Sequence, residues 1–335
     1  MAQTVTRAFD EFLKDPVNLD PADTNLARRS RDWLFDRIEA FPASIPDFPL
    51  LYGGKSMPYG SFSRRTKIRP LDDIDMLSCL AATGATYTVN SHDDVRITPP
   101  NSSRLYALTW NDSDELNSRR VINRYVSALE TVGQYRVAEI NRSGEAATLQ
   151  LNSYEWNFDV VPAFHTSPES DGRSYYLIPN GNGHWKKTDP RIDRDRVIRV
   201  NSQHSGNMLN VLRCVKYWQK RPTMVTMPSY LLECMIVDYF ESVTHQVSHY
   251  VDLELAAAFR AVGRAVIGRV PDPKEIEYDI NTLGWQDRVA IQARALSDAN
   301  KADEARALED SNNQRGSINK WREIFGDEFP QFGAP

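Results

Sequence analysis

Apolar residues recur with helical spacing near the start of the chain and over much of its C-terminal half. Residues 21–41 carry an approximate apolar stripe, which predicts a long surface helix. The other expected helices lie at residues 118–131, 207–220, 229–243, 253–268, 286–300 and 301–311. The last two are close enough to form one helix, and Ser229, directly after Pro228, is a candidate N-cap.

Alternation of apolar and polar residues predicts strands in the N-terminal half of the chain. In the strand expected at residues 72–80, Asp73 and Asp75 share one side, because successive side chains of a strand point to opposite faces. A later strand, at residues 157–164, carries Asp159 on one face. We expect an antiparallel pairing of these strands to bring Asp159 to the first two acids.

Two further patterns complete the expected layout. Residues 135–140 and 147–151 are expected to form a hairpin around the turn at 141–144. Residues 167–195 are rich in Gly, Pro and charge, and are expected to be loops that link two lobes.

A chain of 335 residues is at the size where one hydrophobic core gives way to two. The pattern therefore indicates an α+β protein. We expect a lobe with a mixed or antiparallel sheet at residues 1–195, and a helical lobe at residues 196–335.

The composition of the chain argues against several classes of protein. The net charge of −5 argues against a dedicated nucleic-acid binder, which would carry a basic surplus. The three scattered cysteines indicate neither a disulfide framework nor a zinc site. No apolar run approaches the roughly 20 residues of a membrane span, and the N-terminus lacks a signal-peptide core, so we expect a cytoplasmic protein that does not enter a membrane.

The candidate chemistry lies in a Gly60-Ser61 turn followed by the three acids. Backbone N–H groups and a hydroxyl at such a turn can hold phosphate. Two carboxylates at i and i+2 project from one face of a strand about 6.7 Å apart along it, and a third from a neighbouring strand would close a site for two divalent ions. Such a pair of ions can clamp the attacking and leaving oxygens of a phosphoryl transfer.

Plainer interpretations apply to other residues. The basic cluster Arg64, Arg65, Lys67 and Arg69 is expected to be mixed. A run of charges is usually a solvated face, but one of the four could contact triphosphate oxygens or the acceptor. His245 and His249 are spaced for one helical face, but without a third ligand a structural or surface role is favoured.

Residues 60–70, the Asp73-Ile74-Asp75 motif and residues 158–162 resemble the signature of polymerase-β-like nucleotidyltransferases. Within that superfamily the chain is similar to the bacterial cGAS/DncV-like (CD-NTase) family. The segments that carry this finer resemblance are 178–179, 184–185, 188–190, 212–218, 228–233 and 321–326. The resemblance covers most of the chain and implies a polymerase-β-like lobe beside a helical lobe like that of poly(A) polymerase or oligoadenylate synthase.

The resemblance also implies roles for individual residues. Asp73, Asp75 and Asp159 would be the catalytic residues and would ligate two Mg²⁺ ions, with Mn²⁺ as an alternative. The nucleotide would be held by Gly60, Ser61, Lys216, Ser229 and Tyr230, of which Tyr230 would stack on the donor base. For a tyrosine in an apolar helix a role in the core is the commoner one.

The implied reaction joins nucleoside triphosphates, ATP among them, into a cyclic di- or trinucleotide messenger in bacterial anti-phage signalling. Regulatory partner proteins and a cyclic-nucleotide-sensing effector are implied with it. Two alternatives stay open: transfer to an RNA end, a small molecule or a protein, and a degenerate nucleotide-binding scaffold without activity. The C-terminal tail 329–335 is expected to be flexible enough to meet a partner.

Overall fold

The computed structural model describes residues 2–152 and 154–333. The chain forms two compact units: a sheet unit of residues 21–63 and 71–191, and a helical unit made of the segments 1–20, 64–70 and 192–335. This differs from the single boundary expected after residue 195. The first 20 residues and the segment 64–70 group with the C-terminal helices, because their packing partners lie there.

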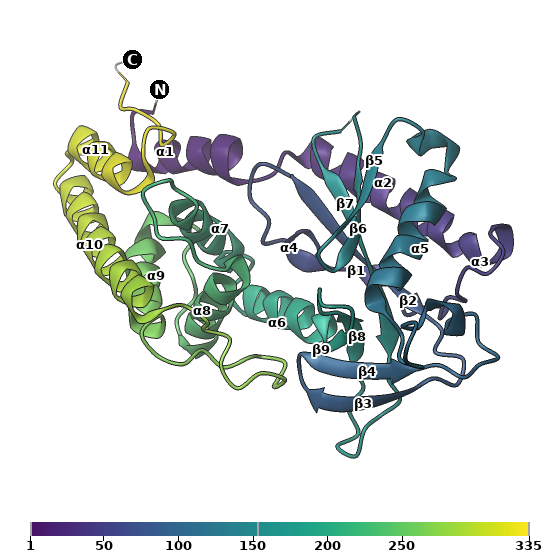
Figure 1. The fold of residues 1–335 in the computed structure, drawn as a ribbon. Coiled ribbons are helices and arrows are strands. Elements are labelled where there is room, and N and C mark those ends of the chain that lie inside the picture. The colour runs from purple at the N-terminus through teal and green to yellow at the C-terminus, as the bar shows by residue number, and fades with distance from the viewer. Residues whose placement is uncertain (1, 153, 334–335) are drawn as a thin grey trace. The chain divides into compact units, whose positions relative to one another are not determined.

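In the described residues, the sheet unit is built on nine strands, seven of them in the order β1-β2-β7-β8-β9-β4-β3, with the β5–β6 hairpin attached to β7 through β6 (Figure 1). The strands are β1 (Met57–Pro58), β2 (Asp73–Leu80), β3 (Thr86–Ser91), β4 (Asp94–Thr98), β5 (Glu139–Ser143), β6 (Ala146–Gln150), β7 (Asn157–His165), β8 (Tyr176–Pro179) and β9 (Trp185–Thr188). All pairings among them are antiparallel except that of β2 with β7.

The sheet unit also contains α2 (Pro21–Glu39), α3 (Phe41–Ser44), α4 (Gly60–Ser63) and α5 (Ser118–Glu130), with 3₁₀ turns at Tyr106–Leu108 and Gly133–Tyr135. Helix α2 packs against β2, and α5 packs against β5, β6 and β7. Tyr125 of α5 is fully buried, and its hydroxyl shares a 2.8 Å hydrogen bond with Ser78 of β2. This contact fixes which face of β2 is covered by helix, since Ser78 is even-numbered and lies opposite the odd-numbered acids.

The helical unit contains α1 (Val5–Phe12), a π-helical turn (Leu13–Val17), α7 (Met208–Gln219), α8 (Ser229–Ser242), α9 (Asp252–Ala265), α10 (Trp285–Asp310) and α11 (Gln314–Phe325). Helix α6 (Pro190–Gln203) begins at the end of the sheet unit and continues in the helical unit. Helix α10 packs along both α9 and α11. The two helices expected at residues 286–300 and 301–311 form one continuous helix, which was the possibility left open for two such adjacent segments.

Several expectations about elements are wrong. The segment 167–195 is not a run of loops, since it contains β8, β9 and the start of α6. Tyr135 is the last residue of a 3₁₀ turn, and residues 136–138 form a turn and a bend. The first strand of the hairpin therefore begins only at Glu139. Ser229 is the first residue of α8 rather than its cap: the cap position is Pro228, which has no side chain that can accept a hydrogen bond from the helix.

The two ends of the described chain pack together within the helical unit. Phe329 is fully buried and stacks on Phe325 at a centroid distance of 5.8 Å, and Phe9 of α1 meets its ring edge-on at 5.0 Å. The N–H of Gly333 donates to the carbonyl of Ala2 over 3.0 Å. The tail expected to be flexible from residue 329 is therefore held as far as residue 333, and residues 334–335 lie outside the described residues.

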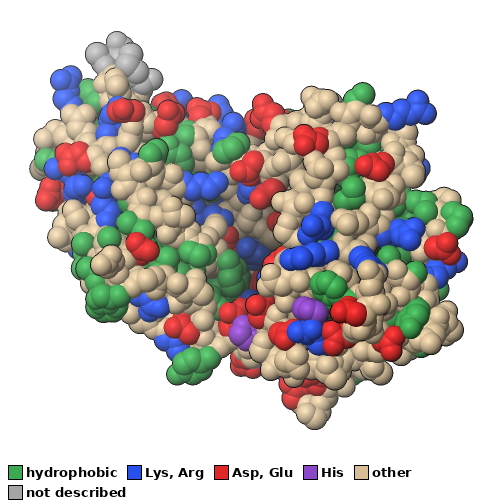
Figure 2. Space-filling view, in the orientation of Figure 1, with side chains coloured by type: hydrophobic (Ala, Val, Ile, Leu, Met, Phe, Trp, Pro, Cys, Tyr) green, Lys and Arg blue, Asp and Glu red, His purple; other side chains and the backbone are tan. Residues whose placement is uncertain are grey.

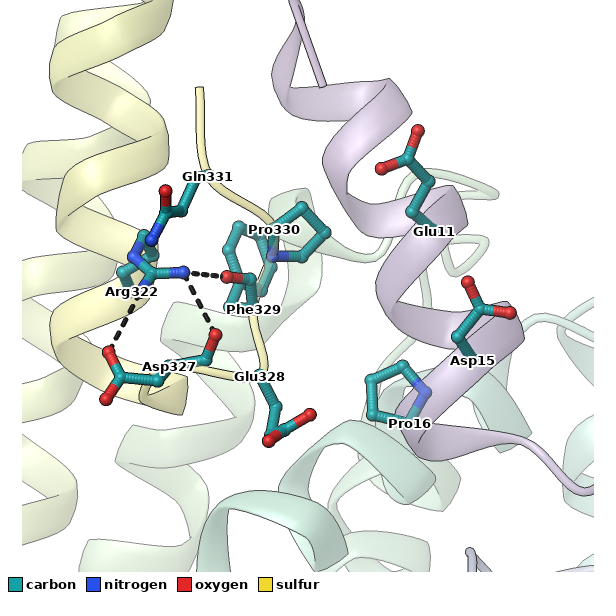
Figure 3. A pocket seen from close by; sticks show the side chains of 9 residues that line it. All are labelled: Glu11, Asp15, Pro16, Arg322, Asp327, Glu328, Phe329, Pro330 and Gln331. Carbon is teal, nitrogen blue, oxygen red and sulfur yellow. Dashed lines mark hydrogen bonds and ion pairs between the residues drawn. The ribbon is translucent and has the colours of Figure 1, made fainter. Parts of the chain in front are cut away.

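Arg322 of α11 also holds the C-terminal tail in place. Its guanidinium donates to the carbonyl of Phe329 and to the carboxylate of Asp327 (Figure 3). Beside these contacts is an open cavity of about 550 Å³, whose rim includes Glu11, Asp15 and Glu328. No helix in the described part of the chain is long and apolar enough to cross a membrane.

Replacement of Phe329 by alanine tests whether the tail is part of the core. The substitution removes a ring buried among aromatic partners, so we expect the free energy of unfolding to fall by about 3–5 kcal/mol, measured by urea or thermal denaturation. Gln331→Ala is the control, because this exposed side chain can be shortened without loss of its backbone bond to Ala2. Equal stability of the two variants would contradict a structural role for the tail.

Candidate active site

The Gly60-Ser61 turn is pressed against β2. Gly60 has φ = +68°, a backbone conformation that residues with a Cβ rarely adopt. It is the first residue of the short helix α4. A Cβ placed on Gly60 would lie 1.7 Å from Oδ2 of Asp75. The N–H of Tyr59 donates to the backbone carbonyl of Asp75 over 3.0 Å. Only glycine therefore lets this backbone approach the Asp75 carboxylate.

The parallel pairing of β2 with β7 places the third acid. In this register Asp73 lies opposite Asn157, and Asp75 lies opposite Asp159. Residues opposite each other on neighbouring strands point to the same face, with the strands about 4.8 Å apart. Asp159 thus shares a face with Asp73 and Asp75, as expected, although the expectation of an antiparallel pairing is wrong.

All three acids are half-buried at the same end of the two strands. Farther along the strands the same face is apolar, with Leu77 and Cys79 on β2 and Val161 and Ala163 on β7 in one buried cluster. Burial raises the pKa of the Cys79 thiol to about 12, so this cysteine stays protonated and belongs to the core. The acids therefore sit where an apolar strand surface gives way to a polar one.

Thr148 of β6 is a site residue that the sequence did not reveal. It lies opposite Asp159 in the antiparallel pairing of β6 with β7, and its hydroxyl donates to Oδ1 of Asp159 over 2.6 Å. This bond fixes the orientation of the Asp159 carboxylate. A threonine in a predicted strand carries no signal of this kind until the register is known.

The three carboxylates suit a hard divalent cation, which prefers oxygen ligands. Among the described residues, no three Asp, Glu, His or Cys side chains are already grouped closely enough to hold a metal ion. The structure thus brings the acids to one face without closing them into a metal-binding cluster. The Asp75 carboxylate occupies the space that a Cβ on Gly60 would need, so the glycine backbone lies directly against this possible metal ligand.

The candidate nucleotide contacts Lys216, Ser229 and Tyr230 all lie in the helical unit. Lys216 and Ser229 line a cavity of about 370 Å³ that also receives Lys220 and Arg221, and no described lining residue is acidic. Lys216 is 4% exposed, and its ammonium donates to Oε1 of Glu233 over 2.5 Å. The structure therefore brings Lys216 and Ser229 to one cavity with a surplus of positive charge.

Tyr230 is held by polar and cationic neighbours. Its hydroxyl donates to Oδ1 of Asp193 over 2.6 Å and accepts from Lys274. The Lys274 ammonium and the Arg64 guanidinium lie over its ring, at 4.3 and 5.6 Å from the centroid. Burial raises the pKa of Tyr230, so the hydroxyl remains a donor. These contacts hold the Tyr230 side chain within the packing of the helical unit.

The basic cluster after the Gly-Ser turn is divided in its roles. Arg64 donates through Nε to Oε2 of Glu233 over 3.0 Å, and Lys67 is 8% exposed. Arg69 donates to the backbone carbonyl of Asn18 over 2.5 Å. Arg65 is exposed. The cluster is therefore mainly structural rather than one solvated face, and Arg65 is the member that faces solvent.

The histidine pair does not share a helix. Residues 243–251 lie between α8 and α9 without regular structure. His245 lies 3.5 Å from Glu254, which supports the structural or surface role that the sequence favoured.

Comparison with solved structures shows the fold. An Escherichia coli MS115-1 CdnC structure with ATP superposes with a TM-score of 0.71 at 16% identity, over 98% of this chain and 100% of that one. The apo form of Vibrio cholerae DncV gives a TM-score of 0.68 at 12% identity, over 98% and 97% of the two chains. CdnC in a complex with HORMA-deltaN gives 0.70 at 16% identity, over 97% and 98%. The α+β architecture is thus confirmed.

Sequence comparison gives a closer relationship. No protein-family model matches the chain. A probable cyclic nucleotide synthase of Bacillus cereus (strain VD146) is 41% identical over 98% of this chain and 99% of its own length. The chain belongs to the cGAS/DncV-like nucleotidyltransferase family. Another curated relative, the cyclic AMP-AMP-AMP synthase of E. coli (strain MS 115-1), is 20% identical over 96% of this chain and 97% of its own.

Membership of the cGAS/DncV-like family sets the class of reaction. The protein is a nucleotidyltransferase of the cyclic nucleotide synthase type, and nucleotidyl transfer in this family depends on metal. The resemblance stated from residues 60–70, 73–75 and 158–162 is thereby confirmed at the level of the family. The roles of individual residues stay predictions.

Substitution of Gly60 by alanine tests the close approach to Asp75. Its Cβ would displace the carboxylate, so we expect nucleotide product to fall at least 100-fold, measured by pyrophosphate release. Gly54→Ala is a matched control with φ = +74° and open space around the added Cβ, so it carries the backbone strain of about 1–2 kcal/mol without the clash. If both variants lose activity equally, the contact with Asp75 has no special role.

Proposed function

We propose that the enzyme joins nucleoside triphosphates, ATP among them, into a cyclic di- or trinucleotide with Asp73, Asp75 and Asp159 as the metal-binding catalytic residues. The observation that carries this proposal is the register of β2 and β7, which puts Asp159 opposite Asp75 on one face of the sheet. The ATP-bound CdnC structure and the GTP-bound V. cholerae DncV structure, whose folds this chain shares, support nucleoside triphosphates as the substrate class.

Each step of the proposed reaction has a residue to perform it. The backbone at Gly60 and the hydroxyl of Ser61 bind donor phosphates at the turn beside Asp75. Lys216 and Ser229 bind donor phosphate from the helical unit, and Tyr230 is the candidate contact for the donor base. Two Mg²⁺ ions, or Mn²⁺, would supply charge neutralisation and Lewis-acid activation at the three carboxylates when bound.

In the first transfer, a ribose hydroxyl of one nucleotide attacks the α-phosphorus of the other. A new P–O bond forms, the bond to pyrophosphate breaks, and the hydroxyl proton passes to the Asp159 carboxylate, which Thr148 keeps oriented. The product is a linear dinucleotide that retains a 5′-triphosphate. When that triphosphate occupies the donor position, the same groups perform a second transfer that closes a ring.

Transfer to an RNA end is less well supported than transfer to a second nucleotide. Acidic and basic side chains are interspersed over much of the face shown in Figure 2, in keeping with the net charge of −5. An enzyme acting on RNA ends would present a broad basic surface to the phosphate backbone. Retention of all three acids argues against a scaffold without activity.

The biological setting is part of the proposal. A role in bacterial anti-phage signalling, with an effector that senses the product, rests on family membership. A HORMA-type regulatory partner is supported by the CdnC:HORMA-deltaN complex, whose CdnC chain shares this fold. The cytoplasmic location also stays a prediction.

Charge-removing substitutions of the three acids test the proposed site. Asp73→Asn, Asp75→Asn and Asp159→Asn each remove one negative charge needed to hold the ions, so we expect product to fall by at least 1,000-fold with little change in thermal stability. Product is measured by mass spectrometry after incubation with labelled nucleoside triphosphates and Mg²⁺.

Asp72→Asn is the matched control. Asp72 is exposed, and by alternation its side chain points away from the face of Asp73 and Asp75, so this variant should keep nearly full activity. A phosphatase-resistant small product supports the cyclase. Label in RNA or protein would show transfer to a macromolecule. A wild-type enzyme without any incorporation, or an active Asp73→Asn/Asp75→Asn double variant, would contradict the proposal.

A further inference from the structure

Glu233 is the centre of a buried group of charges in the helical unit. It lies in the second turn of α8 and is 3% exposed. One of its carboxylate oxygens accepts from Lys216 of α7 over 2.5 Å, and the other accepts from Arg64 of the segment 64–70 over 3.0 Å. The side chains of Lys216 and Arg64 are 5% and 10% exposed, so all three charges are withdrawn from water.

One buried carboxylate is shared between two cations. Arg64 also interacts electrostatically with the buried carboxylate of Asp193. Burial alone would raise the pKa of Glu233, but Arg64 and Lys216 outweigh burial and hold that pKa below its ordinary value. Glu233 is therefore ionised throughout the neutral range.

Lys216 is the member of the group that reaches the cavity. It lines the 370 Å³ space with Ser229, whereas Glu233 and Arg64 are not among the lining residues. Burial lowers the pKa of Lys216, and Glu233 offsets part of this effect by favouring the ammonium. The other charged groups that act on Lys216 are Arg64 and Lys220, both of which disfavour the ammonium.

We propose that Glu233 is a positioning residue for the donor triphosphate: shared between Arg64 and Lys216, it keeps the Lys216 ammonium charged and fixed at the cavity where phosphate is bound. This inference rests on the proposed function, in which Lys216 contacts donor phosphate. Glu233 itself does not touch substrate. The bond from Arg64 holds the Glu233 carboxylate in place on the side away from Lys216.

A lysine without this carboxylate would be a poorer phosphate ligand for two reasons. Its four-carbon side chain would lose the bond that selects one rotamer, and its buried ammonium would lose the neighbour that favours the proton. The second effect predicts a dependence on pH. In the wild type the ammonium persists to higher pH, whereas in a variant without the carboxylate Lys216 is deprotonated at lower pH and phosphate affinity falls as pH rises.

Glu233→Gln tests this assignment, because glutamine keeps the size and an acceptor oxygen but removes the charge. We expect the KM for ATP to rise about 10- to 100-fold at pH 7.5, with a smaller change in kcat, because a charge-assisted contact to the ground-state phosphate is lost. Between pH 7 and 9 the variant's KM should rise more steeply than that of the wild type. Binding of an α,β-methylene analogue of ATP, measured by calorimetry, should weaken in parallel.

Asp252→Asn is the matched control for a general loss of stability. Asp252 is 4% exposed and pairs with Arg306 in the same helical unit, away from the cavity lining, so this variant also breaks a buried ion pair. We expect it to lower the melting temperature by a similar amount while leaving the KM for ATP and its pH dependence unchanged. Glu233→Asp, which retains the charge, should recover part of the affinity.

The double variant Lys216→Met/Glu233→Gln tests whether Glu233 acts through Lys216, and it serves also if Glu233→Gln alone does not fold. Its KM should equal that of Lys216→Met, because the carboxylate has nothing left to position. A further rise in KM, or an unchanged KM and pH profile in Glu233→Gln, would overturn the inference while the wild type still makes product. A wild type that makes no product would instead overturn the proposed function.

Discussion

The parallel pairing of β2 with β7 is the constraint on which the face with the three acids depends. Among the strand pairings of the described residues it is the one that is parallel, and it pairs residues 84 positions apart in the chain, such as Asp73 and Asn157. Its register places Asp75 beside Asp159. A shift by one residue would turn Asp159 to the side covered by α5, because side chains alternate between faces. Such a shift would move the half-buried Asp159 carboxylate among the buried apolar residues of that face, where an unpaired charge is costly.

The surroundings of the acids reinforce this register. On the same face, Leu77, Cys79, Val161 and Ala163 form a buried cluster that would be exposed or broken by slippage. On β6, Thr148 meets Asp159 only in the observed pairing. In the helical unit, buried cations are held by shared carboxylates, as Glu233 is shared between Arg64 and Lys216.

The sequence predicted the acidic face and the helical half because both depend on local periodicity. Asp73 and Asp75 follow from alternation, and α2, α5 and α7 to α10 follow from helical spacing. Direction of pairing was predicted wrongly, because alternation is the same in parallel and antiparallel strands. Strands β8 and β9 were missed because four residues each give too little pattern in a segment rich in Gly and charge. Thr148 and Glu233 needed tertiary contacts that no local pattern records.

Residues far apart in the sequence build each compact unit, and this limits how the protein can be divided. The core of the helical unit includes Phe9 and Phe12 from the N-terminal segment and Ile68 from the segment 64–70. A fragment expressed from residue 192 onward would lack all three and would present their aromatic partners Trp321 and Phe325 to water. Such a fragment should aggregate rather than fold, so each half of this enzyme is best studied by substitution within the whole chain.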